Sequence, residues 1–253
     1  MTQRKQGRRT AEESQRTKLT ILTSAAYLFC QHGYNQVSIR DISERAGVTH
    51  SLVRHYFGAK NQIWFAIIEI VHENMTLYSA KLAEQLSDEI SNSQRLYLFL
   101  AHLMAYVLKK PQLVQLMMDY IHHPENEVEQ IDTNDGEMRS NTTRFVDLSK
   151  STVPKAILQH SENSDIVMWK FLIHAGGTVA FKPFIAPIWP DLSHEQCLFA
   201  HWKLFENQIA YEYQVTNEFR LKGNELDDIV LDIKVLDEET QALFDSHSTN
   251  PLS

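Results

Sequence analysis

The sequence predicts an all-α protein, with a three-helix domain at the N-terminus and a larger helical domain after it. The chain has only 8 glycines and 7 prolines in 253 residues, about half of the roughly 12% that these two residues usually make up. So few turn-forming residues argue against a many-stranded sandwich or barrel. Apolar residues amount to 43% of the chain and recur at helical spacing in several long segments, as expected of a folded helical protein.

Three short helices are predicted in the N-terminal domain, over residues 12–31, 38–46 and 50–56. Gly33 lies where the first helix would end, Ser38 begins a capping box, and Thr49 can cap the third helix. Gly47 supplies a tight turn between the second and third helices. Two short helices joined in this way form a helix-turn-helix, whose second helix enters the major groove of DNA. A helical hairpin of another function would have the same periodicity.

Charge is divided unevenly along the chain, although the total is acidic. The chain has 24 Lys and Arg against 32 Asp and Glu, a formal net charge of −8. Residues 1–63 carry ten basic and four acidic side chains, a local charge of +6, so the remainder carries −14. A basic segment on an acidic body is expected where one end of a protein meets phosphate, although a solvated basic tail gives the same asymmetry.

The N-terminal segment resembles the DNA-binding domain of the TetR family over about residues 17–65. Five short runs carry the resemblance: Ala25-Ala26-Tyr27-Leu28-Phe29, Gly33-Tyr34, Ser38-Ile39-Arg40-Asp41-Ile42, Ala46-Gly47-Val48-Thr49 and Arg54-His55-Tyr56-Phe57-Gly58-Ala59-Lys60. The resemblance implies a dimeric one-component transcriptional regulator, usually a repressor, whose divergent C-terminal domain binds the partner subunit and an effector. Many members have tyrosine in place of Arg54 and histidine in place of Tyr56, but the residues found here can also contact phosphate.

The DNA contacts follow from the helix-turn-helix and from this resemblance. We predict base contacts by Arg40, His50 and Ser51, and phosphate contacts by Ser38, Thr49, Arg54, Tyr56 and Lys60. Arg40 lies one turn into the second helix, where it matches a base-contacting position of the family. The alternative for Arg40 is an ion pair with Glu44, one turn further along the helix.

Four segments are predicted from these patterns: a flexible basic arm over residues 1–12, the helix-turn-helix domain over 13–60, a helical effector-binding and dimerisation domain over 61–223, and an acidic C-terminal extension over 224–253. In the third segment the apolar spacing predicts helices over residues 61–89, 95–110, 112–123, 165–185 and 193–219. Residues 125–136 are expected to form a loop, and residues 137–160 are expected to be helical in part. The extension could form one more amphipathic helix.

The third segment is also predicted to hold an apolar effector pocket. The residues assigned to it are Met104, Met117, Tyr120, Phe145, Trp169, His174 and Thr178. Methionines adapt to irregular shapes, and a few polar side chains orient a bound molecule. The alternative is that these residues are ordinary core and that His174 meets solvent. The helix over 165–185 is expected to be buried on most of its circumference, with one polar ridge at Lys170, His174, Thr178 and Lys182.

A seam for dimerisation is predicted on the helix that begins at Ser193. Leu198, Trp202, Phe205 and Ile209 repeat at 4-3-4 spacing, which suits a facing helix. A two-fold axis would place two such helices from each subunit in a four-helix interface. The alternative is that the seam packs only inside its own subunit.

Other chemistries have little support in the sequence. There is no glycine-rich phosphate loop and no nucleophile with a base at readable spacing. The adjacent pair His122-His123 near Asp119 resembles a metal site only loosely, because neighbouring residues point to different faces of a helix. We therefore expect no enzyme activity, no metal or cofactor and no membrane span, and the two cysteines favour a cytoplasmic location.

The predicted function is that of a transcriptional repressor, bound to a palindromic double-stranded DNA operator as a homodimer and released by a small hydrophobic or amphipathic effector. The alternative is a DNA-binding regulator without an effector, whose helical body binds a protein partner.

Overall fold

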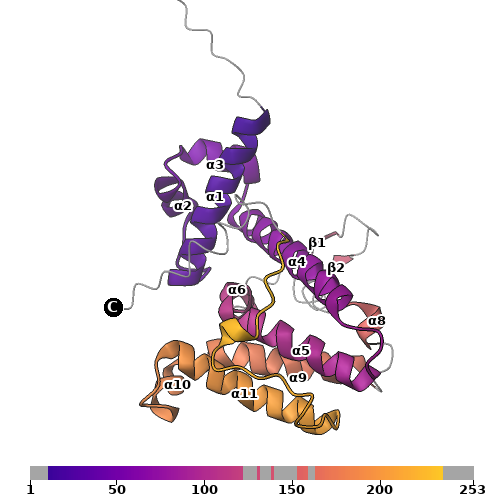
Figure 1. Cartoon of the computed structure of the whole chain (residues 1–253). Helices are drawn as coiled ribbons and strands as arrows, with labels where there is room; N and C mark the ends of the chain where they lie inside the picture. Colours follow the sequence, from indigo (N-terminus) through magenta and orange to yellow (C-terminus); the bar gives the residue numbers. More distant parts are fainter. Residues whose placement is uncertain (1–10, 122–129, 132–137, 140–152, 159–162, 236–253) are drawn as a thin grey trace, which may run out of the picture. The chain divides into compact units, whose positions relative to one another are not determined.

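The computed structural model describes residues 11–121, 130–131, 138–139, 153–158 and 163–235 (Figure 1). Its helices are α1 (Ala11–His32), α2 (Ile39–Arg45), α3 (His50–Phe57), α4 (Lys60–Gln85), α5 (Asn92–Lys109), α6 (Gln112–Ile121), α8 (Lys155–Leu158), α9 (Ser164–Ala180), α10 (Lys182–Ile188) and α11 (His194–Glu212), followed by the 3-10 turn η2 (Leu226–Asp228). The strands β1 (Gln130–Ile131) and β2 (Met138–Arg139) pair antiparallel. Apart from this two-residue ladder, the regular structure in the described part of the chain is helical, and the predicted all-α class is confirmed.

The described residues form two compact units, residues 11–69 and residues 70–235. In the first unit, α1 packs against α2, and α2 packs against α3. The fully buried side chains of Ile21, Ile42 and Val53 give each of these three helices an anchor in a common core. Gly33 and Gly47 have φ angles of 81° and 65°, which favour glycine at the turns that end α1 and α2.

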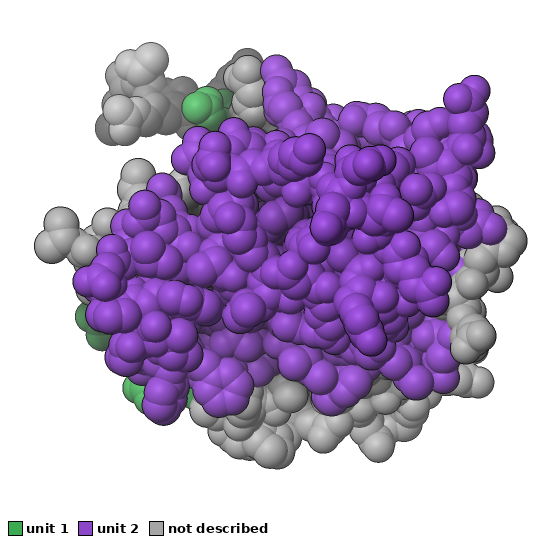
Figure 2. All heavy atoms as spheres, turned by 60° about the horizontal axis from the view of Figure 1, so that its bottom comes forward, with its two compact units in different colours: residues 1–69, 236–253 green, residues 70–235 purple. Residues whose placement is uncertain are grey.

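The second unit is built around α5. All the residues of α5 from Leu96 to Leu108 are buried except Leu98, which is partly buried. The helix contacts α8, α9, α11 and η2, and the indole nitrogen of Trp202 on α11 donates a hydrogen bond of 2.9 Å to the carbonyl of Ala101. Figure 2 shows this unit in purple as a closely packed body. The core of the unit therefore lies where α5 meets α9 and α11.

The chain bends sharply at the end of α9. The helix predicted over 165–185 ends at Ala180, and α10 continues the chain after a bend of 84°. Pro183 lies in the first turn of α10, where no backbone donor is required. Among the described residues, no single helix is long and apolar enough to cross a membrane; α9 and α10 reach that length and composition only as a bent pair.

The segment after α11 is extended, which corrects two predictions. The helix expected to reach residue 219 ends at Glu212, and residues 226–235 form only η2 and extended chain instead of an amphipathic helix. His102 lies 2.7 Å from the carbonyl of Ile229 through Nδ1, and Lys81 donates to the carbonyl of Lys234 at 2.7 Å. Side chains of α4 and α5 thus satisfy backbone groups that a helix would satisfy internally.

Smaller differences concern the ends of elements. The long helix expected over 61–89 ends at Gln85, and α5 begins at Asn92 with a capping box between Ser91 and Gln94. The helix α8 begins immediately after Pro154. Most of the predicted loop over 125–136 and most of the segment 137–160 lie outside the described residues.

Candidate nucleic-acid interface

Local hydrogen bonds fix the start of α2. The Ser38 hydroxyl accepts a bond of 3.2 Å from the Asp41 amide, and the Asp41 carboxylate accepts one of 2.7 Å from the Ser38 amide. The Ser38 hydroxyl also donates to the Asp41 carboxylate at 2.7 Å, and this bond, together with the one from the Ser38 amide, holds the pKa of Asp41 below its usual value. In a closed capping box of this kind, the backbone amides of both Ser38 and Asp41 have a hydrogen-bond partner.

The turn into α3 is fixed in the same way. The Val48 amide donates to the Ser43 carbonyl at 3.0 Å, and the Thr49 hydroxyl accepts a bond of 3.3 Å from the Leu52 amide. Since Val53 is fully buried in the same helix, the rotation of α3 about its axis is set by its anchor. The cap and the anchor together determine which side chains of α3 face outward.

The outward face of α3 is polar. His50, Ser51, Arg54 and His55 are all exposed, and the first two lie at the N-terminal end of the helix, where base readout occurs in helix-turn-helix proteins. The structure thus brings three predicted contact residues, His50, Ser51 and Arg54, onto one surface. His55 was not selected from the sequence, although its spacing of four residues from Ser51 places it on the same face.

Three other predicted contacts already have partners within the unit. Arg40 donates through Nε to Glu44 at 2.9 Å, the ion pair that the sequence offered as an alternative. Both side chains are largely exposed, so solvent screens the pair and Arg40 can exchange Glu44 for another partner. The Tyr56 hydroxyl lies 3.2 Å from the Ser14 hydroxyl of α1.

Lys60 also has a structural role in this unit. Its ammonium donates to the carbonyl of Tyr34 at 2.9 Å and lies 4.1 Å from the centre of the Tyr34 ring. It therefore joins the start of α4 to the residue that follows the α1 turn. A second cation, Arg45, covers the ring of Tyr27 at 3.5 Å, a contact that links α2 to α1 and that no spacing pattern in the sequence indicated.

The predicted dimer seam lies inside the chain's own core. Trp202, Phe205 and Ile209 are only 2%, 1% and 3% exposed in a single chain, and Leu198 is partly buried against the same core. Side chains that are already buried have no apolar area left to give to a partner subunit. The alternative, a seam packed within its own subunit, describes these residues, and the interface assignment is corrected accordingly.

Exposed apolar residues lie instead on other faces of α9, α10 and α11. They are Ile166, Trp169 and Ile173 on α9, Phe184 and Ile188 on α10 together with Phe181 just before it, and Leu204 and Tyr211 on α11. The first three, at spacings of three and four residues, form one stripe along α9. Single exposed apolar residues are common on protein surfaces, but an exposed stripe along a helix is typical of an interaction site.

The polar ridge of α9 faces α11, contrary to the expectation that it would be the only exposed face. Lys170 pairs with Glu212 at 2.7 Å, and His174 Nε2 lies 2.9 Å from the side-chain oxygen of Gln208. These contacts bind the ridge to α11, so the apolar side of α9 is left exposed. Of the four residues predicted to form the ridge, Lys170 and His174 do so, whereas Thr178 is buried and Lys182 lies on α10, beyond the bend.

The residues assigned to an effector pocket lie in different environments. Met104 is fully buried in the core, Thr178 is buried and donates to the Ala175 carbonyl, and Trp169 is 64% exposed. Phe145 lies outside the described residues, as do the side chains of Met117 and Tyr120 on α6. The structure thus brings no pair of these side chains together at a described cavity, and the pocket stays a prediction.

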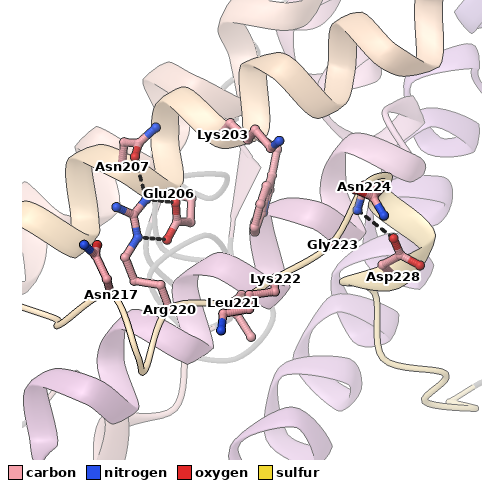
Figure 3. Close-up of a pocket in the computed structure, with 11 residues that line it drawn as sticks. Lys203, Glu206, Asn207, Asn217, Arg220, Leu221, Lys222, Gly223, Asn224 and Asp228 are labelled. Carbon is pink, nitrogen blue, oxygen red and sulfur yellow. Dashed lines mark hydrogen bonds and ion pairs between the residues drawn. The ribbon is translucent and has the colours of Figure 1, made fainter.

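A cavity of about 760 Å³ lies elsewhere, between α11 and residues 217–228 (Figure 3). Its lining is mostly polar and includes none of the predicted effector residues. Within the described residues there is no group of three His, Cys, Asp or Glu side chains that could hold a metal ion. His122 and His123 lie outside them.

Comparisons with known proteins identify the N-terminal unit. Residues 21–67 match the model of bacterial regulatory proteins of the tetR family. The transcriptional repressor NicS of Pseudomonas putida is 28% identical over 117 residues, which are 46% of this chain and 53% of NicS. The transcriptional regulator TtgR of Pseudomonas putida is 35% identical over 66 residues, 26% of this chain and 31% of TtgR. The chain thus spans about half the length of NicS and about a third of TtgR.

Solved structures extend the similarity of fold to the helical body. A putative fatty acid metabolism regulator of Clostridium perfringens has a TM-score of 0.51 at 13% identity, covering 75% of this chain and 96% of that one. SmeT in complex with triclosan has a TM-score of 0.50 at 18% identity, covering 82% and 95%. At these identities the likeness shows the fold alone. The match over residues 21–67 places the N-terminal helix-turn-helix domain in the TetR family, and the helical body shares the fold of these solved structures.

Proposed function

We propose that this protein is a sequence-specific DNA-binding transcriptional regulator that acts as a repressor. The observation that carries the proposal is the exposed polar face of α3, whose N-terminal end presents His50 and Ser51 while Val53 holds the opposite face in the core. In this role His50 and Ser51 read base edges and Arg54 contacts phosphate. Arg40 also contacts a base edge once its ion pair with Glu44 is broken.

Binding-site selection from random duplexes, followed by fluorescence anisotropy on the selected site, tests this proposal. His50→Ala and Ser51→Ala are expected to relax the preference for the selected site over its point variants, by about 1–3 kcal/mol for each lost base contact. Arg54→Ala should weaken all duplexes alike and reduce the salt slope by about one. Lys155→Ala is a matched control, because Lys155 is an exposed cation on α8 in the other unit. Variants of α3 that bind every duplex like the parent would contradict the assignment.

The operator is proposed to be an imperfect palindrome bound by a homodimer, because a single helix-turn-helix reads only one half-site. The exposed stripe Ile166, Trp169 and Ile173 on α9, continued by Leu204 and Tyr211 on α11, supplies the interface in place of the buried seam. Light scattering of Trp169→Glu should give monomers that keep their helical circular dichroism. Leu77→Glu on α4 is the control, since Leu77 is also exposed. A parent protein that is monomeric at micromolar concentration would refute the interface.

We further propose that a small hydrophobic or amphipathic effector releases the operator. Support comes from α4, which begins in the first unit and continues past the boundary at residue 69 into the second, so that a change around α4 in the body has a covalent route to the DNA-binding unit. SmeT, which shares the fold, has been solved with triclosan bound. Hydrophobic and amphipathic molecules should be screened for operator release together with a rise in Tm. An active effector should change operator affinity between about 5- and 150-fold.

A protein partner in place of the effector is the second candidate. The exposed side chains of Phe181, Phe184 and Ile188 around α10 favour it, because they add apolar surface beyond the stripe assigned to the dimer. The effector screen separates the two candidates. An effector that acts equally on the parent and on Phe184→Glu supports the first, whereas a screen without any active molecule favours the second.

A further inference from the structure

The outward face of α3 (Figure 1) carries two histidines, one near each end of the helix. His50 is the first residue of the helix and His55 lies in its last turn, and both side chains are exposed. Residues four apart share a row on a helix surface. His50 therefore lies in one row with Arg54, and His55 lies in the neighbouring row with Ser51. The proposed function gives His50 a contact to DNA and leaves His55 without one.

His55 lies at the level of the helix where a contact to the DNA backbone is proposed. Arg54, its neighbour in the chain, is the proposed phosphate contact, and an α-helix rises only about 1.5 Å from one residue to the next. The His55 ring packs against the ring of Tyr56, with centroids 5.5 Å apart. The Tyr56 hydroxyl in turn lies 3.2 Å from the Ser14 hydroxyl of α1. These contacts restrict the His55 ring before DNA arrives, so little conformational entropy is lost when it meets a phosphate.

No acidic side chain in the described part of the first unit is paired with either histidine. The 8 residues of α3 include no Asp or Glu. On α2, the carboxylates of Asp41 and Glu44 are already bonded to groups of the same helix and its cap. The other acids of α1 and of α4 up to residue 69 are Glu12, Glu13 and Glu69. Within the ranges that the structure describes, none of these acids forms an ion pair with His50 or His55.

The charged groups around this face are mostly cations. Arg54 lies on the face itself, and the Lys18 ammonium of α1 lies 5.8 Å from the centre of the Tyr56 ring. The other basic residues on α1, on α2 and at the start of α4 are Arg16, His32, Arg40, Arg45 and Lys60. A DNA phosphate is therefore the first anion that the two exposed imidazoles would meet.

Imidazole is the side chain that takes up and releases its proton between about pH 5 and 8. An anion within about 4–6 Å favours the protonated form, which donates hydrogen bonds from both ring nitrogens. We propose that His50 and His55 bind DNA as imidazolium ions, so that operator binding takes up protons from solution and strengthens in acid. His55 is then a further phosphate contact, and His50 favours guanine, whose O6 and N7 atoms only accept. This inference rests on the proposed function, because it requires α3 to meet DNA.

Fluorescence anisotropy on the selected operator tests the proposal, with the full-length protein at constant ionic strength and at several pH values between about 8 and 6. The parent's affinity should rise at least about tenfold over this range, the equivalent of one pKa unit for a single group. The double variant His50→Gln/His55→Gln should lose this rise, because the glutamine amide donates and accepts hydrogen bonds but does not titrate. Both positions are exposed, so the variant should keep the parent's Tm.

The two single variants separate the two kinds of contact. His55→Gln should reduce the pH dependence by the same factor for every duplex, because a phosphate contact does not depend on sequence. His50→Gln should reduce it most for duplexes with guanine at the position that His50 reads. The matched control is His194→Gln, an exposed histidine on α11 in the second unit, which should keep the parent's pH dependence.

The ratio of the parent's affinity to that of the double variant isolates the two histidines. A loss of stability of the body in acid weakens binding, which is the opposite sign, and it is common to both proteins. The proposal is overturned if this ratio is the same at both ends of the pH range, or if His55→Gln keeps the parent's pH dependence. A selected operator that is bound with a constant ratio overturns this inference alone, whereas a failure to select any duplex overturns the proposed function.

Discussion

The helices α3 and α11 differ in how their sequence patterns relate to their surroundings. On α3, the polar residues selected from the sequence, His50, Ser51 and Arg54, are exposed on one face. On α11, the apolar residues selected as an interface, among them Trp202 and Phe205, are buried against the chain's own α5 and α9. A short capped motif thus specifies both a helix and its outward face. An apolar stripe specifies only that one face is buried, and not which helix or subunit it packs against.

The largest expected difference in the free energy of unfolding is between variants of Phe205 and of Ser51. Phe205 is fully buried and meets the ring of Phe171 edge-on at 6.0 Å, so Phe205→Ala should lower the free energy of unfolding by about 3–5 kcal/mol. Ser51→Ala, on the exposed face of α3, should change it by no more than about 0.5 kcal/mol. Urea titrations measure both. A Phe205→Ala variant of unchanged stability that has become monomeric would restore the seam to the subunit interface.

The next largest effect distinguishes Lys60 from Arg54, two basic residues of the first unit, by the stability of their alanine variants. Lys60→Ala removes the bond to the Tyr34 carbonyl and should lower the free energy of unfolding by about 1.5 kcal/mol as well as weaken operator binding. Arg54→Ala should weaken operator binding without a change in stability, since Arg54 is exposed. Thermal unfolding and anisotropy on the same samples distinguish the two. Equal melting temperatures for the two variants would mean that Lys60 only contacts DNA.

A smaller loss of stability is expected when the capping box of either unit is removed. Ser38→Ala at α2 and Ser91→Ala at α5 each remove one cap, and each should lower the free energy of unfolding by about 1 kcal/mol. Only Ser38→Ala is expected to weaken operator binding as well, because α2 supports α3. If Ser91→Ala weakened operator binding equally, the loss would follow from stability rather than from the interface.

The smallest effect is in the pH dependence of the body. Burial lowers the pKa of His102 and of His201, so the unfolded chain takes up protons first as the pH falls below about 6.5, and stability should decline from there. His102→Asn keeps a donor for the Ile229 carbonyl and removes the titration, so it should flatten that decline in urea titrations between pH 7.5 and 5. An unchanged decline would assign it to His201 instead.

The stability of the first unit should begin to fall only at a lower pH than that of the body. The hydrogen bonds from Ser38 lower the pKa of Asp41, and this contribution to stability is present above the ordinary carboxyl pKa of about 3.9 and is lost only below it. Asp41→Asn should therefore lower the free energy of unfolding at pH 7. The decline in stability between pH 7.5 and 5 should stay the same. A variant that alters the decline in that range would show that the two units do not unfold separately with pH.

The sequence by itself determined the structure that depends on near neighbours. The all-helical class, the caps at Ser38 and Thr49, the start of a helix at Ser193 and the glycine turn at Gly47 could all be predicted from the sequence, because capping and turn geometry are decided within about four residues. The outward face of α3 follows from the same local bonds together with one buried anchor. Those of these features that lie in the first unit also carry the resemblance to the TetR family.

Only the tertiary structure decided what each apolar stripe packs against. Burial of apolar area has no direction of its own, so the spacing of Trp202, Phe205 and Ile209 could not distinguish α5 from a second subunit. The polar ridge of α9 was readable as a ridge, but its partners Glu212 and Gln208 lie 42 and 34 residues away. The extended segment that follows α11, up to residue 235, could not be predicted from the sequence for the same reason. Its backbone is satisfied by Tyr97, His102 and Lys81, which no local pattern relates to residues more than a hundred positions later.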